Sequence, residues 1–520
     1  MQEIHIDKDR LSIDEVVAIA RRGAVVTASA QGEARVERAR QLIARWVRER
    51  RVIYGITTGF GALCDVTISP AEVRLLQQKI LMSHATGVGA PLPVEAVRAV
   101  MAVRLHDLLM GYSGCSMETL RYLMTFLNAG VTPVVPEKGS VGASGDLAPT
   151  AHLGLVLIGL GEAFYQGRRI SGAQVLEALQ LPPRVLEAGE GLALINGTQV
   201  MTGIAALVVH DAVRLAKLAD IACAMSLEVL MGSSSELDPR IHHIRPHPGQ
   251  IATAENILRL TEDSAIILSH KGCARLQDAY TLRCSPQIHG ASKDAVIHAR
   301  RVVDIEINST TTNPLIFVDT EEVRSGGNFH GQPIAMAADY LAMGVAELGN
   351  VSERRIERLV NPQLSELAPF LVKKCGLNSG FMTAQYTAAA LVSENKVLAH
   401  PACIDSIPTS ANKEDHVSMG TIAVRQCREI LDNVEHIVAV EMLCAAQAYD
   451  LLTEPNKLQS GVGTRAAYQV IRERIPYLRE DRVLALDIEA MIELIRSEEL
   501  VRRVEAVIGP LRLSSSDGTA

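Results

Sequence analysis

The 520-residue sequence has few aromatic residues, which make up 3% of the chain and include a single tryptophan. Its hydrophobic share of 48% therefore consists mainly of alanine, leucine, valine and isoleucine. Residues of this kind pack well along long helices, so the composition predicts a mainly helical protein. The length alone would allow three or four domains.

The chain also has no excess of positive charge and no long uncharged apolar run. Its net charge is −8 and its isoelectric point is about 6.0, which argues against a nucleic-acid partner. The N-terminus shows no basic stretch followed by an apolar one, and charged residues interrupt the apolar stretches. We therefore expect no membrane association and a cytoplasmic location.

Nine cysteines are scattered without a C-x-x-C pair, which predicts reduced thiols rather than disulfides. His242, His243 and His247 lie close together and could suggest zinc. However, Pro246 and Pro248 break any helix that would align them, and no cysteine or acidic ligand motif accompanies them. We interpret these histidines as part of a surface loop and expect no metal.

A glycine-rich segment stands out between Glu137 and Phe164. Gly139, Gly142 and Gly145 fall within seven residues, and an apolar helical pattern begins at Leu147. The pattern predicts a tight loop that enters the N-terminus of a buried helix. A helix presents unpaired N–H groups and the positive end of its dipole at this position.

The tripeptide Ala143-Ser144-Gly145 lies in this loop and permits an unusual reaction of the backbone. Because glycine has no Cβ, the Gly145 nitrogen can approach the Ala143 carbonyl and close a five-membered ring. Loss of water from the ring and from Ser144 would leave an exocyclic methylene, which is an electrophile. From spacing alone, a glycine-rich turn or an anion-binding nest is the favoured interpretation.

The run GSVGASGDLAP closely resembles the signature of the aromatic amino acid ammonia-lyases. In that family Ala-Ser-Gly becomes a 4-methylidene-imidazol-5-one group. The resemblance therefore implies that this group forms autocatalytically from Ala143, Ser144 and Gly145. It also implies a mainly α, fumarase/aspartase-like fold, with a long central helical bundle and a smaller N-terminal active-site domain.

The resemblance also predicts how the chain is divided. We expect a mixed N-terminal domain at residues 1–110, which carries a mobile tyrosine loop. A long-helix domain at residues 111–511 would carry the Ala-Ser-Gly segment. Residues 512–520 read as a flexible tail.

Further motifs extend the resemblance over most of the chain. YGITTGFG resembles a mobile inner loop of the family, which implies Tyr54 as the catalytic tyrosine. LINGTQ implies that Asn196 contacts the ring group or the substrate. QDAYTLR resembles the substrate-binding motif, in which Arg283 would bind the substrate carboxylate through its two-pronged donor array. Gln277 and Tyr280 would then lie beside the amino acid.

Each of these motifs also has a simpler structural interpretation. Tyr54 could be a packing residue of a loop, and Asn196 could be the N-cap of the long helix that follows it. Gln277, Tyr280 and Arg283 are spaced three apart, so on a helix or helical turn they would share one face, which could be a solvated face.

Two proline- and glycine-containing stretches, TTTNPL and GGNFHGQP, read as turns between helices. Both also match the family. The resemblance implies that Asn313 lies near the ring group and that Phe329 lines the substrate pocket.

Two motifs bear on the choice of substrate. Ser83-His84 resembles the histidine-specific form of the family, although some aminomutases also resemble it, and the pair could simply end a helix. The run SANKEDHVSMG carries Glu414, which in histidine-specific members faces the imidazole and which phenylalanine and tyrosine lyases lack. An acid at a helix start is the simpler interpretation. Lys413 departs from the family pattern, where we expect Gln.

We therefore expect an enzyme that eliminates ammonia from L-histidine to give trans-urocanate, the first step of histidine degradation. The resemblance implies a homotetramer with shared active sites. An electrophile would activate the amine, which is a poor leaving group, and Tyr54 would remove the weakly acidic β-proton. Tyrosine or phenylalanine ammonia-lyase, or a 2,3-aminomutase, is the alternative function. A non-catalytic helical scaffold is the second alternative.

Overall fold

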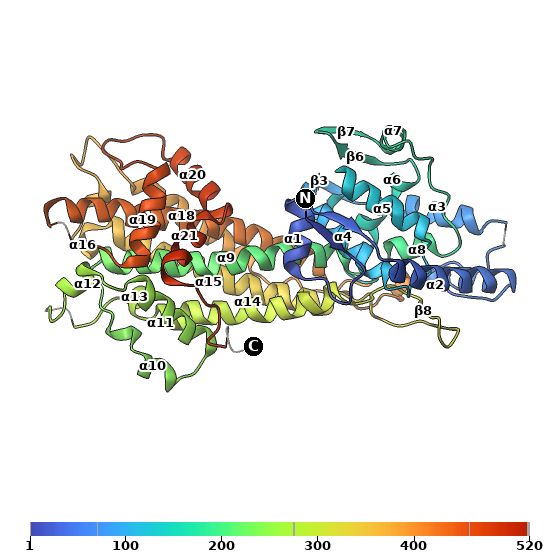
Figure 1. Cartoon of the computed structure of the whole chain (residues 1–520), viewed down its shortest axis with the longest axis horizontal. Coiled ribbons are helices and arrows are strands. Elements are labelled where there is room, and N and C mark those ends of the chain that lie inside the picture. Colours follow the sequence, from blue (N-terminus) through green and yellow to red (C-terminus); the bar gives the residue numbers. More distant parts are fainter. Residues whose placement is uncertain (1, 70, 274–275, 457, 517–520) are drawn as a thin grey trace. The chain divides into compact units, whose positions relative to one another are not determined.

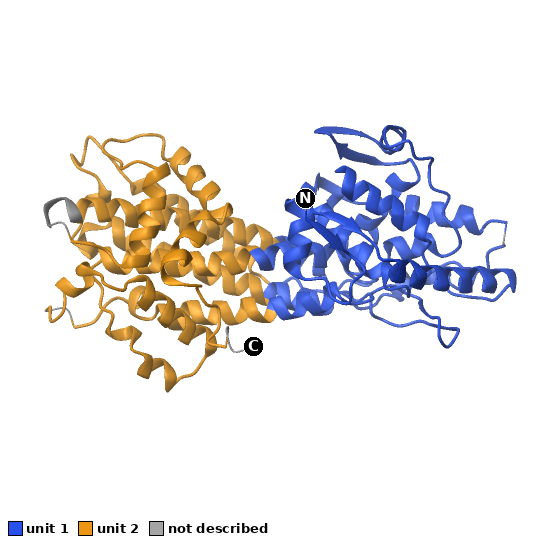
Figure 2. Cartoon of the chain, in the orientation of Figure 1, with its two compact units in different colours: residues 1–210, 299–339, 401–425 blue, residues 211–298, 340–400, 426–520 orange. Residues whose placement is uncertain are grey.

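The structure is a computed structural model that describes residues 2–69, 71–273, 276–456 and 458–516. The chain forms two compact units, each assembled from three separate segments (Figure 2). Unit 1 comprises residues 1–210, 299–339 and 401–425, and unit 2 comprises residues 211–298, 340–400 and 426–520. The boundary predicted at residue 110 falls inside unit 1, and the predicted division into domains stays a prediction.

Four long helices contribute residues to both units. They are α9 (Gln199–Val229), α14 (Ser285–Ile307), α15 (Gln332–Val360) and α18 (Gly420–Asn456). The sequence predicts long helices at residues 198–231, 333–358 and 421–451, which correspond to α9, α15 and α18, because their apolar positions recur at helical spacing. The fold is mainly helical, as predicted.

The other α-helices of unit 1 precede and follow the segment that carries Ala143-Ser144-Gly145. They are α1 (Ile13–Arg21), α2 (Ala30–Arg48), α3 (Val73–His84), α4 (Val94–Leu109), α5 (Met117–Ala129), α6 (Leu147–Leu157), α7 (Gly172–Ala178) and α8 (Glu190–Ile195). Local signals explain several ends. Ser12 and Glu15 form a capping box at the start of α1, and Gly130 ends α5 in the left-handed conformation, with φ +76°.

The strands of unit 1 are short and form small separate sheets. β1 (Glu3–His5) pairs in parallel with β2 (Val25–Thr27), and β3 (Val88–Pro91) pairs antiparallel with β5 (Pro136–Lys138). β4 (Thr132–Pro133), β6 (Glu162–Tyr165) and β7 (Arg168–Ser171) form a three-stranded sheet, with α7 beside it (Figure 1). β8 (Leu315–Phe317) and β9 (Glu322–Arg324) form a hairpin. The strand β5 leads directly into the glycine-rich loop.

The remaining helices belong to unit 2. They are α10 (Pro239–His243), α11 (Pro248–Leu260), α12 (Ala265–Ser269), α13 (Tyr280–Arg283), α16 (Pro362–Ser365), α17 (Met382–Leu398), α19 (Val462–Arg474), α20 (Leu484–Arg496) and α21 (Glu499–Ile508). Across the described residues of both units, no helix is long and apolar enough to cross a membrane.

Two interpretations from the sequence need correction in unit 2. The surface-loop interpretation holds for His247, whereas His243 is exposed but ends the helix α10, and His242 is buried on the same helix. Its Nε2 lies 3.0 Å from the Glu236 carbonyl oxygen and its Nδ1 lies 3.0 Å from Gln250 Nε2. Burial lowers the pKa of His242, so a neutral ring with both nitrogens hydrogen-bonded is favoured.

The second correction concerns α17, because the apolar pattern of residues 382–400 predicts a long core helix there. The structure buries Ala384, Ala388 and Asn395 of this helix, whereas Tyr386 and Val397 are exposed. At the C-terminus, residues 512–516 of the predicted tail lie against α11, where Arg512 N donates to Asn256 Oδ1 at 3.0 Å. Residues 517–520 lie outside the described residues.

Candidate active site

The glycine-rich loop between β5 and α6 packs too closely against a neighbouring loop to hold larger side chains. Gly145 has φ +74°, in the left-handed region that favours glycine. A Cβ added to Gly145 would lie 2.0 Å from the Gly197 carbonyl oxygen. The same carbonyl accepts a hydrogen bond of 2.8 Å from Asp146 N. The local backbone geometry therefore requires glycine at position 145.

Four helix N-termini meet at this loop. Asp146 precedes α6 and accepts hydrogen bonds from Met201 N, in the first turn of α9, and from Thr421 Oγ1, in the first turn of α18. Gly331, directly before α15, donates its N–H to the Gly142 carbonyl oxygen at 3.4 Å. Each N-terminus carries the positive end of a helix dipole, so the loop lies in a field that favours negative charge.

Asp146 is a buried carboxylate inside this arrangement, and the sequence motifs assign it no role. Its side chain is fully buried and accepts a 2.9 Å hydrogen bond from Ser140 Oγ. Burial raises the pKa of Asp146, while the Thr421 hydroxyl and the Met201 amide act against that rise. Its place directly before an apolar helix in GDLAP was the available signal, since acids are favoured at helix starts.

Ser144 and Glu414 meet although 270 positions separate them. Ser144 Oγ donates to Glu414 Oε1 at 2.8 Å, and Thr409 Oγ1 donates to Glu414 Oε2 at 2.6 Å. The interpretation of Glu414 as a helix-start acid is wrong, because α18 begins at Gly420. The structure instead places the Glu414 carboxylate against the side chain from which the predicted electrophile would form.

His84, the last residue of α3, lies near Glu414. Its ring packs against Phe60 with centroids 5.0 Å apart, and its Nδ1 lies 2.9 Å from the Ile80 carbonyl oxygen. Burial lowers the pKa of His84, while the Ile80 carbonyl and the negative charge of Glu414 act in the opposite direction. The lowered pKa favours a neutral imidazole. Ser83 is exposed, and its Oγ lies 3.0 Å from His84 Nδ1.

Tyr54 is half-buried in the loop that follows α2. Its hydroxyl oxygen accepts a 3.0 Å hydrogen bond from Gly61 N. A Cβ added to Gly61 would lie 3.0 Å from Ser410 Oγ, so the tyrosine loop touches the segment that carries Glu414. Lys413, the departure from the family pattern, reaches Cys64 Sγ at 3.7 Å from the same segment. The structure thus brings together two loops that the sequence could only name separately.

Asn196 ends α8 and is almost fully buried. The N-cap interpretation is wrong, because the next helix begins at Gln199. Its backbone carbonyl accepts a 2.9 Å hydrogen bond from the buried Arg104 Nη1, whereas its side-chain Oδ1 has no partner among the described residues. A buried acceptor without a donor is costly, so Oδ1 fits a group supplied by a ligand.

Asn313 and Phe329 lie in two loops that are bonded to each other. Asn313 Oδ1 accepts a 3.0 Å hydrogen bond from Gly326 N. Phe329 is half-buried in the 326–331 loop, which contacts the glycine-rich loop through Gly331. Both residues therefore belong to unit 1, with Tyr54 and the Ala-Ser-Gly segment.

Gln277, Tyr280 and Arg283 belong to unit 2 instead. The shared helical face holds for Tyr280 and Arg283, whose guanidinium carbon lies 5.1 Å from the centre of the tyrosine ring. It is wrong for Gln277, which precedes α13 and is exposed. The side chain of Tyr280 is 69% exposed, so the motif presents its groups outward from this unit.

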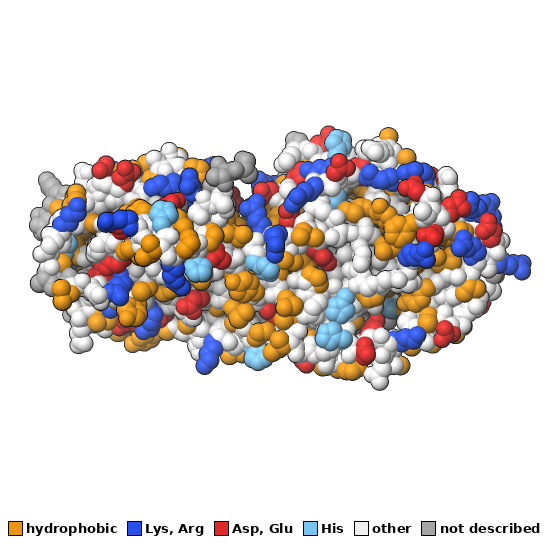
Figure 3. Space-filling model, turned by 90° about the horizontal axis from the view of Figure 1, so that it is seen from below, with side chains coloured by type: hydrophobic (Ala, Val, Ile, Leu, Met, Phe, Trp, Pro, Cys, Tyr) orange, Lys and Arg blue, Asp and Glu red, His pale blue; other side chains and the backbone are white. Residues whose placement is uncertain are grey.

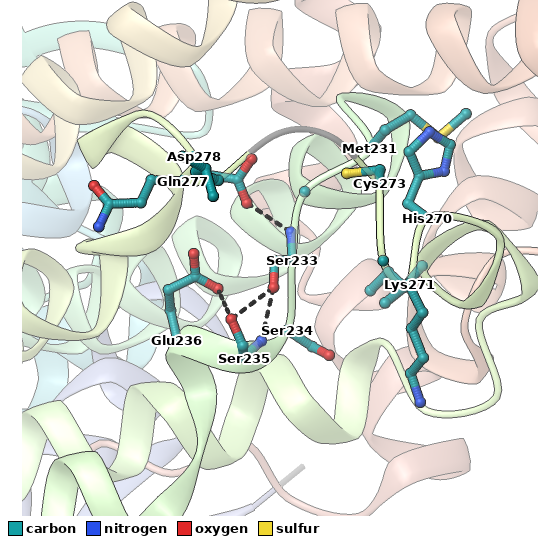
Figure 4. Close-up of a pocket in the computed structure, with 14 residues that line it drawn as sticks. Met231, Ser233, Ser234, Ser235, Glu236, His270, Lys271, Cys273, Gln277 and Asp278 are labelled. Atoms are coloured by element: carbon teal, nitrogen blue, oxygen red, sulfur yellow. Dashed lines mark hydrogen bonds between the residues drawn. The ribbon is translucent and has the colours of Figure 1, made fainter.

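A cavity of about 500 Å³ lies beside this motif in unit 2 (Figure 4). Its polar wall includes Gln277, Asp278 and a hydrogen-bonded run of serines. Asp278 Oδ2 accepts a 2.6 Å hydrogen bond from Ser233 N, and Ser233 Oγ lies 2.7 Å from Ser235 Oγ. These bonds tie the residues before α13 to the segment that follows α9.

The chain matches the family model for aromatic amino acid lyases over residues 11–473. It is 57% identical over 501 residues to the histidine ammonia-lyase of Symbiobacterium thermophilum, which covers 96% of this chain and 98% of the relative. The solved histidine ammonia-lyase of Trypanosoma cruzi is 43% identical, with a TM-score of 0.90 over 98% of this chain and 96% of the other. The tyrosine aminomutase of Streptomyces globisporus is 37% identical, with a TM-score of 0.92 over 98% of this chain and 100% of the other.

Proposed function

The chain belongs to the aromatic amino acid lyase family and is a carbon–nitrogen lyase, and from this premise we propose that its substrate is L-histidine. The reaction gives trans-urocanate and ammonia, the first step of histidine degradation. The observation that carries the choice of histidine is the position of Glu414, whose Oε1 lies 2.8 Å from Ser144 Oγ, with His84 beside it. A pocket that pairs the imidazole nitrogens would reject benzene rings, because its own polar groups would be left unpaired.

We propose that Ala143, Ser144 and Gly145 close into a 4-methylidene-imidazol-5-one group. The residues present fit this group: the left-handed φ and the tight packing at Gly145 leave room for a bare backbone nitrogen and for no side chain. Once formed, the group would supply an electrophile for the amine. The four helix N-termini around the loop would stabilise the negative charge that develops there.

The other side chains of unit 1 would position the substrate and move one proton. Tyr54 would take the β-proton, the electrons of that C–H bond would form the double bond, and the amine would leave as ammonia. The partnerless Oδ1 of Asn196 would accept a hydrogen bond from the bound molecule. Asn313 and Phe329 would line the same pocket, and His84 would face the imidazole together with Glu414.

Gln277, Tyr280 and Arg283, which belong to unit 2, are proposed to bind the carboxylate end of an amino acid in the shared active sites of the homotetramer. Arg283 would hold the carboxylate through paired N–H donors, with Tyr280 and Gln277 beside the α-carbon. The cation–ring contact between Arg283 and Tyr280 limits the directions in which the guanidinium can point.

We propose a homotetramer with shared active sites, in the cytoplasm. On the face drawn in Figure 3, hydrophobic side chains form several patches between charged ones. Along α15, the exposed side chains Met336, Tyr340 and Met343 follow one helix face, and α17 exposes Tyr386 and Val397. Exposed apolar helix faces of this kind are typical of subunit contacts. Light scattering of the purified protein tests the assembly.

The deciding assay compares L-histidine, L-tyrosine and L-phenylalanine in parallel and follows the absorbance of the unsaturated acids. We expect turnover of histidine and little or none of the other two.

The likeness to the tyrosine aminomutase and the Ser83-His84 pair favour a second candidate, a 2,3-aminomutase. That activity would appear as a β-amino acid from tyrosine or phenylalanine, with no lasting rise in absorbance. A protein that acts on none of the three, and whose mass shows no loss of two waters, would instead be a scaffold.

A further inference from the structure

The helix α13 is too short to hold its own position. It spans the four residues Tyr280–Arg283, and isolated helices below about 12 residues are marginal in water. The chain before it is exposed at Leu276 and Gln277. Tertiary contacts must therefore fix the direction in which the side chains of Tyr280 and Arg283 point.

One such contact comes from a buried arginine on α15. Arg355 is fully buried, and its Nη1 donates to the Thr281 carbonyl oxygen at 3.4 Å, in the middle of α13. Ser285 Oγ donates to the next carbonyl, that of Leu282, whose side chain is itself buried. The turn is thus attached through two successive backbone carbonyls and one apolar side chain.

The guanidinium of Arg355 is itself held firmly. Glu441 of α18 accepts hydrogen bonds of 2.5 Å from Nε and 2.9 Å from Nη2. Ser226 and Ser352 donate to the two remaining acceptor positions of the same carboxylate, at 2.7 and 2.6 Å. Burial opposes the charge on Arg355, but the Glu441 carboxylate raises the pKa of Arg355 above its ordinary value. The group therefore stays charged.

The network continues through buried groups on α14 and α9. Arg355 Nη1 also lies 3.3 Å from His289 Nε2, while His289 Nδ1 lies 2.9 Å from Asp220 Oδ1. Lys293 Nζ completes the set at 2.5 Å from Asp220 Oδ2. Burial lowers the pKa of His289, with the hydrogen bond to Asp220 acting against it. A neutral His289 can donate from Nδ1 and accept from Nε2 in this arrangement.

A buried charged network of this kind is weak evidence for a role in stability. Replacing a buried ion pair by well-packed apolar side chains is often neutral or stabilising, because burying two charges costs about as much as their attraction returns. What the charged network does supply is a fixed orientation of the Arg355 side chain. It holds one guanidinium so that Nη1 faces the Thr281 carbonyl.

We propose that Arg355 is a positioning residue that orients Arg283 for the substrate carboxylate by holding the backbone of α13. The proposal rests on the proposed function only in that Arg283 binds the carboxylate. Every aromatic amino acid that the family would accept carries an α-carboxylate, so the role of Arg355 does not depend on histidine being the substrate.

The test is a double-variant cycle with Arg355→Lys and Arg283→Lys. Lysine keeps the charge opposite Glu441 but cannot make two bonds to it and also reach Thr281. We expect Arg355→Lys to raise KM about 10-fold, the equivalent of one modest hydrogen bond, with kcat within a factor of about three. In the Arg283→Lys background the same change should have almost no further effect on KM, because Arg355 acts through Arg283.

Two matched variants separate positioning from general damage. Arg214→Lys alters another buried arginine of unit 2, whose described ion pairs are with Asp211 and Glu435, and KM should stay at the wild-type value. If Arg355→Lys does not fold, the paired change Arg355→Met with Glu441→Leu is used instead. This pair removes both buried charges, and it takes the place of Arg355→Lys in the double-variant cycle.

Three results would overturn the proposal. They are an unchanged KM, effects of the two substitutions that multiply independently, and a fall in kcat equal to the change in KM. Failure of the proposed function would look different, since the wild type would then not turn over histidine. In that case the cycle is run on whichever aromatic amino acid the wild type does accept.

Discussion

Each unit of the protein buries an arginine–carboxylate pair, and the two pairs differ in geometry. In unit 2, Arg355 meets Glu441 through two hydrogen bonds of 2.5 and 2.9 Å. In unit 1, the closest approach of Arg104 to Asp107 is 3.6 Å. Nε and Nη2 of Arg104 have no hydrogen-bond partner among the described residues. The residue types are nearly the same, so the contrast isolates the effect of geometry.

The net pKa shifts of the two arginines have opposite signs, although burial lowers the pKa of both. Burial lowers the pKa of Arg104 to about 10 and raises the pKa of Asp107 to about 7, because the loose pair compensates each charge poorly. The two-bond contact of Arg355 raises its pKa although it is equally buried. The attraction and hydrogen bonds of a close carboxylate can thus outweigh the cost of burying an arginine.

Both arginines also donate to a backbone carbonyl in a segment that carries predicted site residues. Arg104 Nη1 contacts the Asn196 carbonyl oxygen at 2.9 Å, and Arg355 Nη1 contacts that of Thr281 at 3.4 Å. The proposed roles of the two segments differ, since unit 1 would carry the electrophile and the base, and unit 2 the carboxylate-binding group. Substitution of the electrophile or the base in unit 1 should then act on bond making, and substitution of Arg283 in unit 2 on substrate affinity.

The largest effect should come from Ser144→Ala in unit 1. Without the hydroxyl, no methylene can form, so turnover should fall by at least about 10⁴-fold, as when a covalent catalytic group is removed. The fold should survive, because alanine fits wherever serine fits. Activity, circular dichroism and intact mass are measured on one preparation. Activity near that of the wild type would end the backbone-electrophile mechanism.

A smaller loss should follow Glu414→Gln, which keeps the shape of the side chain and removes its charge. Histidine turnover should fall about 10²-fold, because a hydrogen bond to a charged group contributes roughly 1.5–3 kcal/mol. Ring formation should continue, because it depends on residues 143–145. Histidine deamination and intact mass are measured together. A variant with the ring formed and a wild-type rate would show that Glu414 has no role in the reaction.

In unit 2, Arg283→Lys should change affinity more than rate. Lysine keeps the charge but loses the paired donors, so kcat/KM should fall about 10- to 100-fold, mostly through KM. Steady-state kinetics with L-histidine measure both constants. If kcat fell while KM stayed constant, the division of roles between the two units would be wrong. An unchanged kcat/KM would reassign Arg283 to a structural role.

The sequence predicts the long helices well but not the neighbours of single charged residues. Helical spacing is a local signal, and it predicts helices at residues 75–83 and 333–358, close to the observed α3 and α15. It gives no reason to distinguish Arg354 from Arg355 on α15, although the first side chain is 55% exposed and the second is fully buried. Adjacent residues on a helix point in different directions, and which one faces the interior is decided by other helices.

The candidate site shows the same limit. The motifs name Ser144 and Glu414, but nothing local indicates that residues 270 positions apart touch. The neighbouring prolines predict a surface loop at His242, because they break helices. The ring is instead buried with hydrogen bonds to Glu236 and Gln250, which no local pattern indicates. Nothing in the sequence indicates the hydrogen bonds of Arg104. It bonds to the backbone carbonyl of Asn196, at the end of α8, and lies near Asp107, one turn along its own helix.

The smallest effect on turnover should come from Asp107→Asn, which instead tests the loose pair through its pH dependence. Asp107 has a pKa of about 7 in the folded protein, above its ordinary value of 3.8. Between these two values the folded state binds a proton that the unfolded state releases. The free energy of unfolding should therefore fall as the pH rises from 4 to 7, by at most about 4 kcal/mol.

Asparagine has no proton to lose in this range, so the variant should lack that part of the decline. Denaturant unfolding of both proteins, at a series of pH values from 4 to 8, measures the difference. We expect the variant to gain stability relative to the wild type as the pH rises. The exposed Asp319→Asn serves as the control and should show no such gain. Parallel curves for Asp107→Asn and the wild type would mean that Arg104 compensates Asp107 fully at 3.6 Å, and the contrast with Arg355 and Glu441 would disappear.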